Sequence, residues 1–246
     1  METGLRNRTV LVTEVGNPLG ISSALAFARE GANLILGSCD NGDALREAER
    51  AVLAAGAKAI SGVYDAGNEE QVKAFARKGC DHFGRIDVLV NNVAGAGAKQ
   101  SLTSMSFSAW KRSIHVGLTG CLFICRAVLP SMIERRWGRV IQFIGLQGFV
   151  GGEPATSAVH MGLVGLTRGI ATQYGKSGVT ANCIGYGGVD GIDNFPNSYP
   201  PVKLNDPLER TGTSQEVSSA AVYLASNDAG YITGQCYLVN GGKNFL

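Results

Sequence analysis

The chain has 246 residues, 45% of them hydrophobic, and a formal net charge of +2. This length suits one large domain or two small ones, and the absence of a basic run argues against nucleic acid binding. No uninterrupted apolar stretch reaches about 18 residues, so we expect no membrane-spanning helix. The first residues, METGLRNRTVLVT, run into a strand without the apolar segment of a signal peptide, so we expect a cytoplasmic protein.

Strand-like apolar runs alternate with amphipathic segments along the chain. The expected strands are 8–13, 33–36, 58–63, 86–91, 140–144, 179–184 and 235–239. The expected helices are 18–29, 43–55, 69–83, 107–136, 156–174 and 215–225. This alternation predicts a doubly wound α/β fold, a parallel sheet with helices on both faces.

No linker interrupts the alternation, so we expect residues 1–246 to form a single domain. Residues 185–212 contain a long irregular segment rich in Gly, Pro and Asn. A loop of this length in a compact domain is typical of a lid over a substrate site.

The six cysteines and three histidines do not form a metal-binding pattern. Cys121 and Cys125 lie four residues apart in an expected helix, but no histidine pair completes a ligand set. We interpret the cysteines as small core residues in a reducing compartment and predict no metal site.

The strand at 140–144 is nearly continuous in apolar residues, as expected of a strand buried on both faces. In a parallel sheet the carboxyl end of such a strand usually carries the chemistry. Here glycines follow the strand, and a helix begins near Glu153 and Pro154. The polar side chains available at this end are those of Gln147, Thr156, Ser157 and His160. The position is therefore almost bare of catalytic groups.

Several stretches together resemble the short-chain dehydrogenase/reductase family. They are VLVT at 10–13, ALAFAREGANLIL at 24–36, GRIDVLVNN at 84–92, LTG at 118–120, GRVI at 138–141, GLVGLTR at 162–168, and YLASNDAGYITGQ with VNGG near the C-terminus. The resemblance implies a Rossmann-like domain with a central seven-stranded parallel sheet. It also implies a nicotinamide cofactor, a catalytic Asn–Ser–Tyr–Lys set, and dimers or tetramers.

The family's glycine-rich turn corresponds to residues 13–20, where only Gly20 remains of three glycines; Glu14 and Pro18 replace the others. A pyrophosphate needs free N–H groups at a helix N-terminus and no intervening side chain. At about 4 Å, a carboxylate and a phosphate repel by about 4 kcal/mol at an effective dielectric of ~20. Asn17 is a good N-cap and proline suits the first helical position. We therefore expect a helix start that no longer binds phosphate.

The rest of the dinucleotide site is mixed. Ser38 stands where the family places an acidic or basic residue that selects NAD or NADP. Asp65 and Asn91 match residues near the adenine, but both also suit structural roles. Gly191 stands where a threonine would hold the carboxamide. We therefore expect no cofactor to be bound by this chain itself.

All four catalytic positions of the family have changed. The asparagine corresponds to Gly117, the serine to Gly145, the tyrosine to Thr156 and the lysine to His160. No tyrosine or lysine lies between residues 139 and 173, so a shifted alignment restores neither group. Loss of one general acid or base typically costs about 10²- to 10⁴-fold in rate. The resemblance thus implies a family member whose active site is degenerate.

The segments through which family members associate are well preserved, namely the helices at 107–136 and 156–174 and the C-terminal segment. We therefore predict a pseudoenzyme subunit that completes a hetero-oligomer, expected to be a tetramer. Its partner would be an active homologous chain that binds NAD.

Other functions stay open. The first is an oxidoreductase with an unconventional active site. The second is a cofactor-free lyase or hydratase in which His160 and Thr156, one helical turn apart, act together; Glu153, Ser157 and His115 are further candidates. The third is a sensor with a ligand pocket under the loop. We also expect apolar side chains to fill the emptied cleft. The candidates are Phe143, Phe149, Tyr186, Phe195 and Tyr199.

Overall fold

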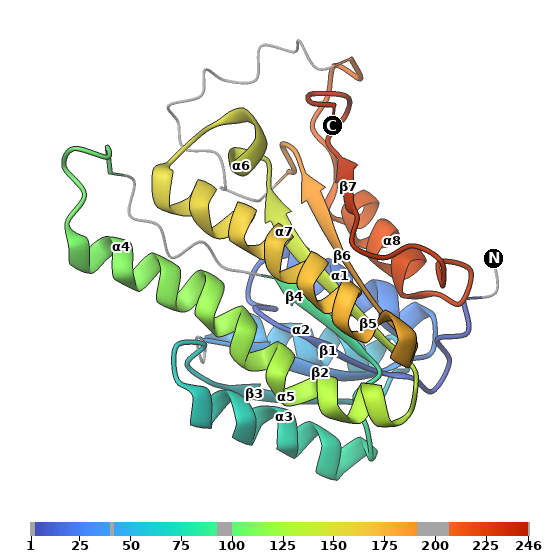
Figure 1. The fold of residues 1–246 in the computed structure, drawn as a ribbon. Helices are drawn as coiled ribbons and strands as arrows, with labels where there is room; N and C mark the ends of the chain where they lie inside the picture. The colour runs from blue at the N-terminus through green and yellow to red at the C-terminus, as the bar shows by residue number, and fades with distance from the viewer. Residues whose placement is uncertain (1–2, 40–41, 93–99, 191–206, 246) are drawn as a thin grey trace.

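A computed structural model of the chain describes residues 3–39, 42–92, 100–190 and 207–245. At its centre is a seven-stranded parallel sheet in the order β3-β2-β1-β4-β5-β6-β7 (Figure 1). The strands are β1 Thr9–Val12, β2 Asn33–Ser38, β3 Ala59–Val63, β4 Val88–Asn92, β5 Gly138–Gly145, β6 Val179–Tyr186 and β7 Cys236–Val239. The strand order reverses between β1 and β4, which confirms the predicted doubly wound sheet.

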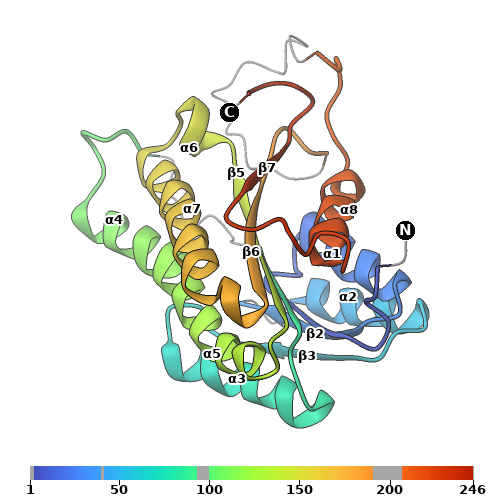
Figure 2. The same ribbon diagram turned by 45° about the vertical axis from the view of Figure 1, so that its right-hand side comes forward.

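Helices cover both faces of the sheet (Figure 2). One layer holds α1 Pro18–Arg29, α2 Asp43–Ala54 and α8 Ser214–Ala225. The other layer holds α3 Glu69–Phe83, α4 Phe107–Ile114, α5 Gly120–Glu134 and α7 Pro154–Tyr174. Two further short helices are α6 Gln147–Val150 and the 3-10 turn η2 Gly175–Ser177.

The sheet has a hydrophobic core on each face. Every residue of β4, β5 and β6 is buried, which explains the nearly continuous apolar runs in these strands. Phe27 of α1 and Phe143 of β5 belong to the same core cluster, so the two halves of the sheet share one core under α1 and α8.

The prediction of one continuous α-helix at 107–136 is wrong for its middle part. A π-helical segment, η1 His115–Thr119, separates α4 from α5. The loop before α3 packs against this segment: Nε2 of His115 bonds the carbonyl oxygen of Gly67 at 2.8 Å. A Cβ added to Gly120 would lie 2.8 Å from the carbonyl oxygen of Ala66. This close approach accompanies the local change of helical hydrogen bonding, and such π segments are frequent at functional sites.

The other differences from the predicted elements are small. The short helix α6 was not predicted, and α7 begins at Pro154, behind an N-cap at Glu153 that accepts from the backbone N–H groups of Ala155 and Thr156. Strand ends differ by one or two residues, which is within the usual spread of assignments.

The helical run Phe107–Glu134 is long and apolar enough to cross a membrane by length and composition. The sequence expectation concerned uninterrupted apolar stretches, whereas this run passes on its average hydropathy and contains charged residues. Core helices of globular domains pass the same test, and here the run packs against α3 and α7 within the fold.

The loop after β6 is closed at its base. Val189 pairs with Gly212 in an isolated bridge, and the N–H of Gly212 donates to the carbonyl oxygen of Gly188 at 2.9 Å. The predicted lid at 185–212 therefore has a fixed base at residues 187–190 and 211–212. Residues 191–206 lie outside the described residues.

Candidate functional site

The turn between β1 and α1 is the segment in which the sequence resemblance places the family's glycine-rich turn. Glu14 has a φ of +52°, in the left-handed region, which costs a non-glycine residue about 1–2 kcal/mol. At Gly20, an added Cβ would overlap the carbonyl oxygen of Glu14 and lie 2.6 Å from the Cα of Val15. The packing of α1 on this turn therefore requires Gly20 whether or not a phosphate binds.

One N–H at the N-terminus of α1 is capped by a side chain of the protein. Oδ1 of Asn17 accepts from the N–H of Gly20 at 2.9 Å and from Nδ2 of Asn92 at 2.9 Å. Pro18, the first helical residue, has no N–H to offer. The prediction that Asn17 caps this helix is confirmed. The N–H of Gly20, which could otherwise donate to a phosphate, donates to Asn17 instead.

A small cavity lies among the described residues at the expected adenosine end of the site. A cavity of about 30 Å³ lies at the carboxyl ends of the strands, with Glu14, Cys39, Tyr64 and Asn91 among its lining residues. This volume has room for roughly one or two water molecules, whereas small-molecule sites span about 300–1,000 Å³. Partial burial, followed by a hydrogen bond to Glu14, raises the pKa of the Cys39 thiol to about 12. Ser38 is buried, only 3% exposed.

Asn91 and Asp65, the two positions that match the family, are engaged within the protein. Nδ2 of Asn91 donates to Oε1 of Gln142 at 2.6 Å and to Sγ of Cys121 at 2.7 Å, and its Oδ1 accepts from Thr13 at 2.9 Å. The carboxylate of Asp65 accepts from the backbone N–H two residues later at 2.8 Å. Asn91 thus ties together β1, β4, β5 and α5, as its structural reading predicts.

The position of the family's serine is filled from two sides. A Cβ added to Gly145 would overlap Oε1 of Gln147 and lie 3.0 Å from Cε1 of His160. Both side chains are buried, at 6% and 7% exposure. Gln147 also covers Gly152, where an added Cβ would lie 2.7 Å from the Gln147 Cγ. No serine side chain fits beside Gly145 unless Gln147 moves.

The position of the family's asparagine is filled by α7. Gly117 lies in η1, and an added Cβ would lie 2.8 Å from Cγ1 of Val159, which is buried. A valine in a helix has one strongly preferred rotamer, so it yields poorly to a new neighbour. A Cβ added to Gly162 of α7 would likewise lie 2.8 Å from Cδ2 of Leu118 in η1. The two glycines let α7 approach η1 closely, and an asparagine at 117 has no space there.

The tyrosine and lysine positions hold groups that bond to backbone or to a cap. The hydroxyl of Thr156 donates to Glu153 at 2.7 Å, so it is directed to the helix cap and the proposed pairing with His160 is not formed. His160 bonds the backbone of Gly145, and burial lowers its pKa to about 4. Oγ of Ser157 donates to the carbonyl oxygen of Gln147 at 3.0 Å. Ser157 thus ties α7 to α6, His160 ties α7 to the end of β5, and Thr156 supports the N-cap of its own helix.

Two of the five aromatic residues expected to fill the cleft are buried in the core. Phe143 and Tyr186, on neighbouring strands, meet edge to face with ring centroids 6.4 Å apart. Phe149 is partly buried against a core cluster that includes Val159. The other two candidates, together with the carboxamide position, fall outside the described residues; they are Phe195, Tyr199 and Gly191.

Sequence reasoning missed the part played by Val159 and Cys39. Val159 stands three residues after Thr156, on the buried side of the same helix, and this spacing was the available signal. Cys39 follows Ser38 at the end of β2, but its bond to Glu14 depends on the geometry of two separate loops. Among the described residues, no group of three His, Cys, Asp or Glu side chains is placed to hold a metal ion.

Among the described residues, the side chains at these positions do not match the dinucleotide site that the family resemblance implies. Glu14 places a carboxylate at the turn where the family binds pyrophosphate, and the adjoining cavity is far smaller than a nucleoside. Thr156 supplies no proton donor of suitable pKa for a carbonyl. Within the described ranges, the side chains at the four positions pack helices against the sheet and do not form the Asn–Ser–Tyr–Lys set that the resemblance implies.

A family model described as "Enoyl-(Acyl carrier protein) reductase" matches residues 16–244. The (2S)-[(R)-hydroxy(phenyl)methyl]succinyl-CoA dehydrogenase subunit BbsD of Thauera aromatica is 32% identical, over 99% of this chain and 99% of its own. The 3-oxoacyl-[acyl-carrier-protein] reductase of Synechocystis sp. is 31% identical, over 98% of both chains.

Solved structures agree with these sequence matches. The crystal structure of levodione reductase has a TM-score of 0.90 at 28% identity, covering 97% of this chain and 98% of its own. NAD+-bound xylitol dehydrogenase has a TM-score of 0.89 at 25% identity, covering 97% and 99%. With its sheet order and nearly full-length matches, the chain belongs to the short-chain dehydrogenase/reductase family of oxidoreductases.

Proposed function

We propose that the chain is a non-catalytic subunit of a hetero-oligomeric short-chain dehydrogenase, assembled with an active NAD-dependent homologue. The packing at the catalytic positions carries this proposal. Val159 closes the space beside Gly117, and Gln147 and His160 close the space beside Gly145. Such filling stabilises a fold that no longer has to admit a substrate.

The relative from Thauera aromatica supports assembly with a homologue, because its name describes a subunit of a dehydrogenase. The specific enzyme that we propose is the 2-[hydroxy(phenyl)methyl]succinyl-CoA dehydrogenase of anaerobic toluene degradation, with this chain as its degenerate subunit. In this proposal the complex is a cytoplasmic tetramer, and NAD binds to the active chain.

An oxidoreductase with an unconventional site is the second candidate. It is favoured by relatives whose names describe reductases, among them the Synechocystis enzyme. The cofactor-free lyase is favoured less, because the hydroxyl of Thr156 is bound to Glu153 and a histidine with a pKa near 4 is a weak base at neutral pH.

Isothermal titration with NAD(H) and NADP(H) separates these functions. We expect no binding to the purified chain, because Glu14 opposes the pyrophosphate and the adenosine cavity is too small. After co-expression with a homologous dehydrogenase, we expect about half a site per chain, since only the active subunit binds. Binding of one nucleotide per chain in the isolated protein would instead favour the oxidoreductase with an unconventional site.

A further inference from the structure

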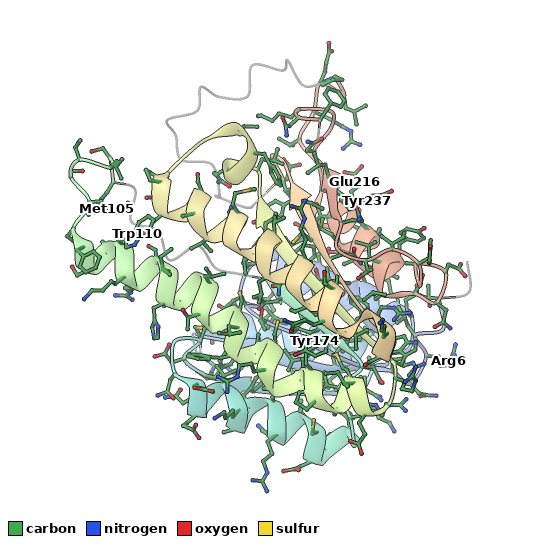
Figure 3. The ribbon with its side chains drawn as sticks, in the orientation of Figure 1. Arg6, Met105, Trp110, Tyr174, Glu216 and Tyr237 are labelled. Atoms are coloured by element: carbon green, nitrogen blue, oxygen red, sulfur yellow. The ribbon has the colours of Figure 1, made fainter. Side chains whose placement is uncertain are left out.

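The outer surface formed by α4, α5 and α7 is here called the helix face. The three helices lie along one side of the molecule, with Trp110 on α4 and Tyr174 at the far end of α7 (Figure 3). Along α7 the exposed residues are mostly small or uncharged, and Arg168 is the one charged residue among them. They are Met161, Gly165, Arg168, Gly169, Thr172 and Gln173. A Cβ added to Gly165 or Gly169 would meet nothing within 4 Å, so another backbone can approach closely.

The helix face exposes large apolar side chains, as surfaces that pack against another protein chain do. Phe107 is 71% exposed, Met161 42% and Leu122 38%. Only 44% of the most apolar stretch of the run Phe107–Glu134 is buried within the chain. A helix surface of this kind is typical of one that packs against a further element.

The charges on the same helices are almost all of one sign. Four cations, Lys111, Arg112, Arg126 and Arg168, stand against a single acidic residue, Glu134, in α4, η1, α5 and α7, all of whose residues the structure describes. These helices carry a charge of +3, whereas the whole chain carries only +2. The helix face is therefore more basic than the rest of the molecule taken together.

Part of this charge has no counterion within the chain. Arg126 pairs with Glu69 of α3 at 3.1 Å, and Lys111 lies 4.9 Å from the ring of Phe107. Within the described part of the chain, neither Arg112 nor Arg168 forms an ion pair. Two guanidinium groups thus remain available to a partner.

The charge of the helix face favours a different partner chain over a second copy of this chain. A twofold pair of identical chains uses one patch twice, so each charge on the patch meets residues of that same patch. Glu69 neutralises Arg126, but Lys111, Arg112 and Arg168 have no acidic partner among the described residues, so a twofold pair gathers unpaired cations from both copies on one interface. Like charges across an interface disfavour the wrong partner. An acidic counterpart converts the same contacts into attractive ones.

We propose that the helix face selects a homologous chain whose matching helices carry acidic residues, in preference to a second copy of this chain. This inference rests on the proposed function, because it gives the chemistry of the partner that a non-catalytic subunit needs. The flat side of α7 supplies the close apolar contact, and the surrounding cations supply the selection.

A charge-reversed copy of the chain tests this without knowledge of the natural partner. The copy carries Lys111→Glu, Arg112→Glu, Arg126→Glu and Arg168→Glu. Mixed with the unchanged chain, it is expected to form one-to-one dimers at least about tenfold tighter than either chain forms alone, as measured by sedimentation at about 0.01 M salt. The preference should shrink at about 1 M salt, where the screening length is only ~3 Å.

A matched control reverses four exposed cations away from this surface, at Arg6, Arg29, Arg50 and Lys58. It should show no preference for the unchanged chain. If the reversed copy does not fold, as judged by circular dichroism, the four cations are changed to Gln, and dimers of that neutral copy should exceed those of the unchanged chain.

Two results would overturn the inference. One is a homodimer of the unchanged chain as tight as the mixed pair and insensitive to salt. The other is the absence of pairing in every mixture. The measurement uses no nucleotide, so its failure is distinct from a failure of the proposed function, which the cofactor titration reports.

Discussion

Lowering the pH from about 7.5 to about 4 is expected to remove about 3 kcal/mol from the free energy of unfolding through His160 alone. Burial lowers the pKa of this imidazole from 6.5 to about 4 in the folded chain. The unfolded chain takes up the proton as the pH falls through 6.5, and the folded chain takes it up only near 4. The stability is therefore fully present above pH 6.5 and is lost between pH 6.5 and 4.

Urea unfolding of the native chain and of His160→Gln across this pH range measures the effect. Glutamine keeps a donor that can reach the backbone of Gly145 but does not titrate, so this variant should lose about 3 kcal/mol less on acidification. His82→Gln is the matched control, because it makes the same substitution at an exposed histidine. Parallel losses in all three proteins would show that His160 is not held neutral by burial.

Most of the fold was predictable because its signals are local. The limits of α1 and α3 agree with the prediction, since Asn17 and Asn68 are recognisable N-caps and Gly84 is a left-handed C-cap. The apolar runs of β4 to β6 marked strands buried on both faces. The π segment at 115–119 was missed because the loop at residues 66–67 packs against it, and that loop lies about fifty residues away in the sequence.

For the candidate site, too, the sequence predicts the local features and misses those that depend on packing between distant segments. That Gly117, Gly145, Thr156 and His160 stand at the family's catalytic positions remains a prediction from the sequence resemblance, which rests on the neighbouring motifs. The sequence did not show which side chains occupy the space beside Gly117 and Gly145. This depends on a rotamer of Val159 and on the path of the Gln147 side chain, both of which are set by packing between elements.

Introducing an asparagine at position 117 is expected to destabilise the chain by about 1–3 kcal/mol. The side chain would enter the space held by Cγ1 of Val159, and a β-branched residue in a helix has no good alternative rotamer. Gly165→Asn is the matched control. It places the same side chain on α7 in open space, and should change stability by no more than about 0.5 kcal/mol.

A double-mutant cycle shows whether Val159 is the cause. Val159→Ala alone should cost about 1–2 kcal/mol by leaving a cavity. If the two side chains compete for one space, Gly117→Asn combined with Val159→Ala should cost at least about 1 kcal/mol less than the sum of the single changes. Additive costs would place the strain of asparagine in the backbone of the π segment instead.

The same competition bears on any attempt to revive catalysis. Restoring the family's set requires Gly117→Asn, Gly145→Ser, Thr156→Tyr and His160→Lys together. The first two changes meet Val159 and Gln147, and the last removes a side chain packed against Gly145. We therefore expect this quadruple variant to be less stable than the native chain and to show no dehydrogenase activity with NAD or NADP. Turnover by such a variant would mean that the site had lost only its reactive groups, and that its packing still admits cofactor and substrate.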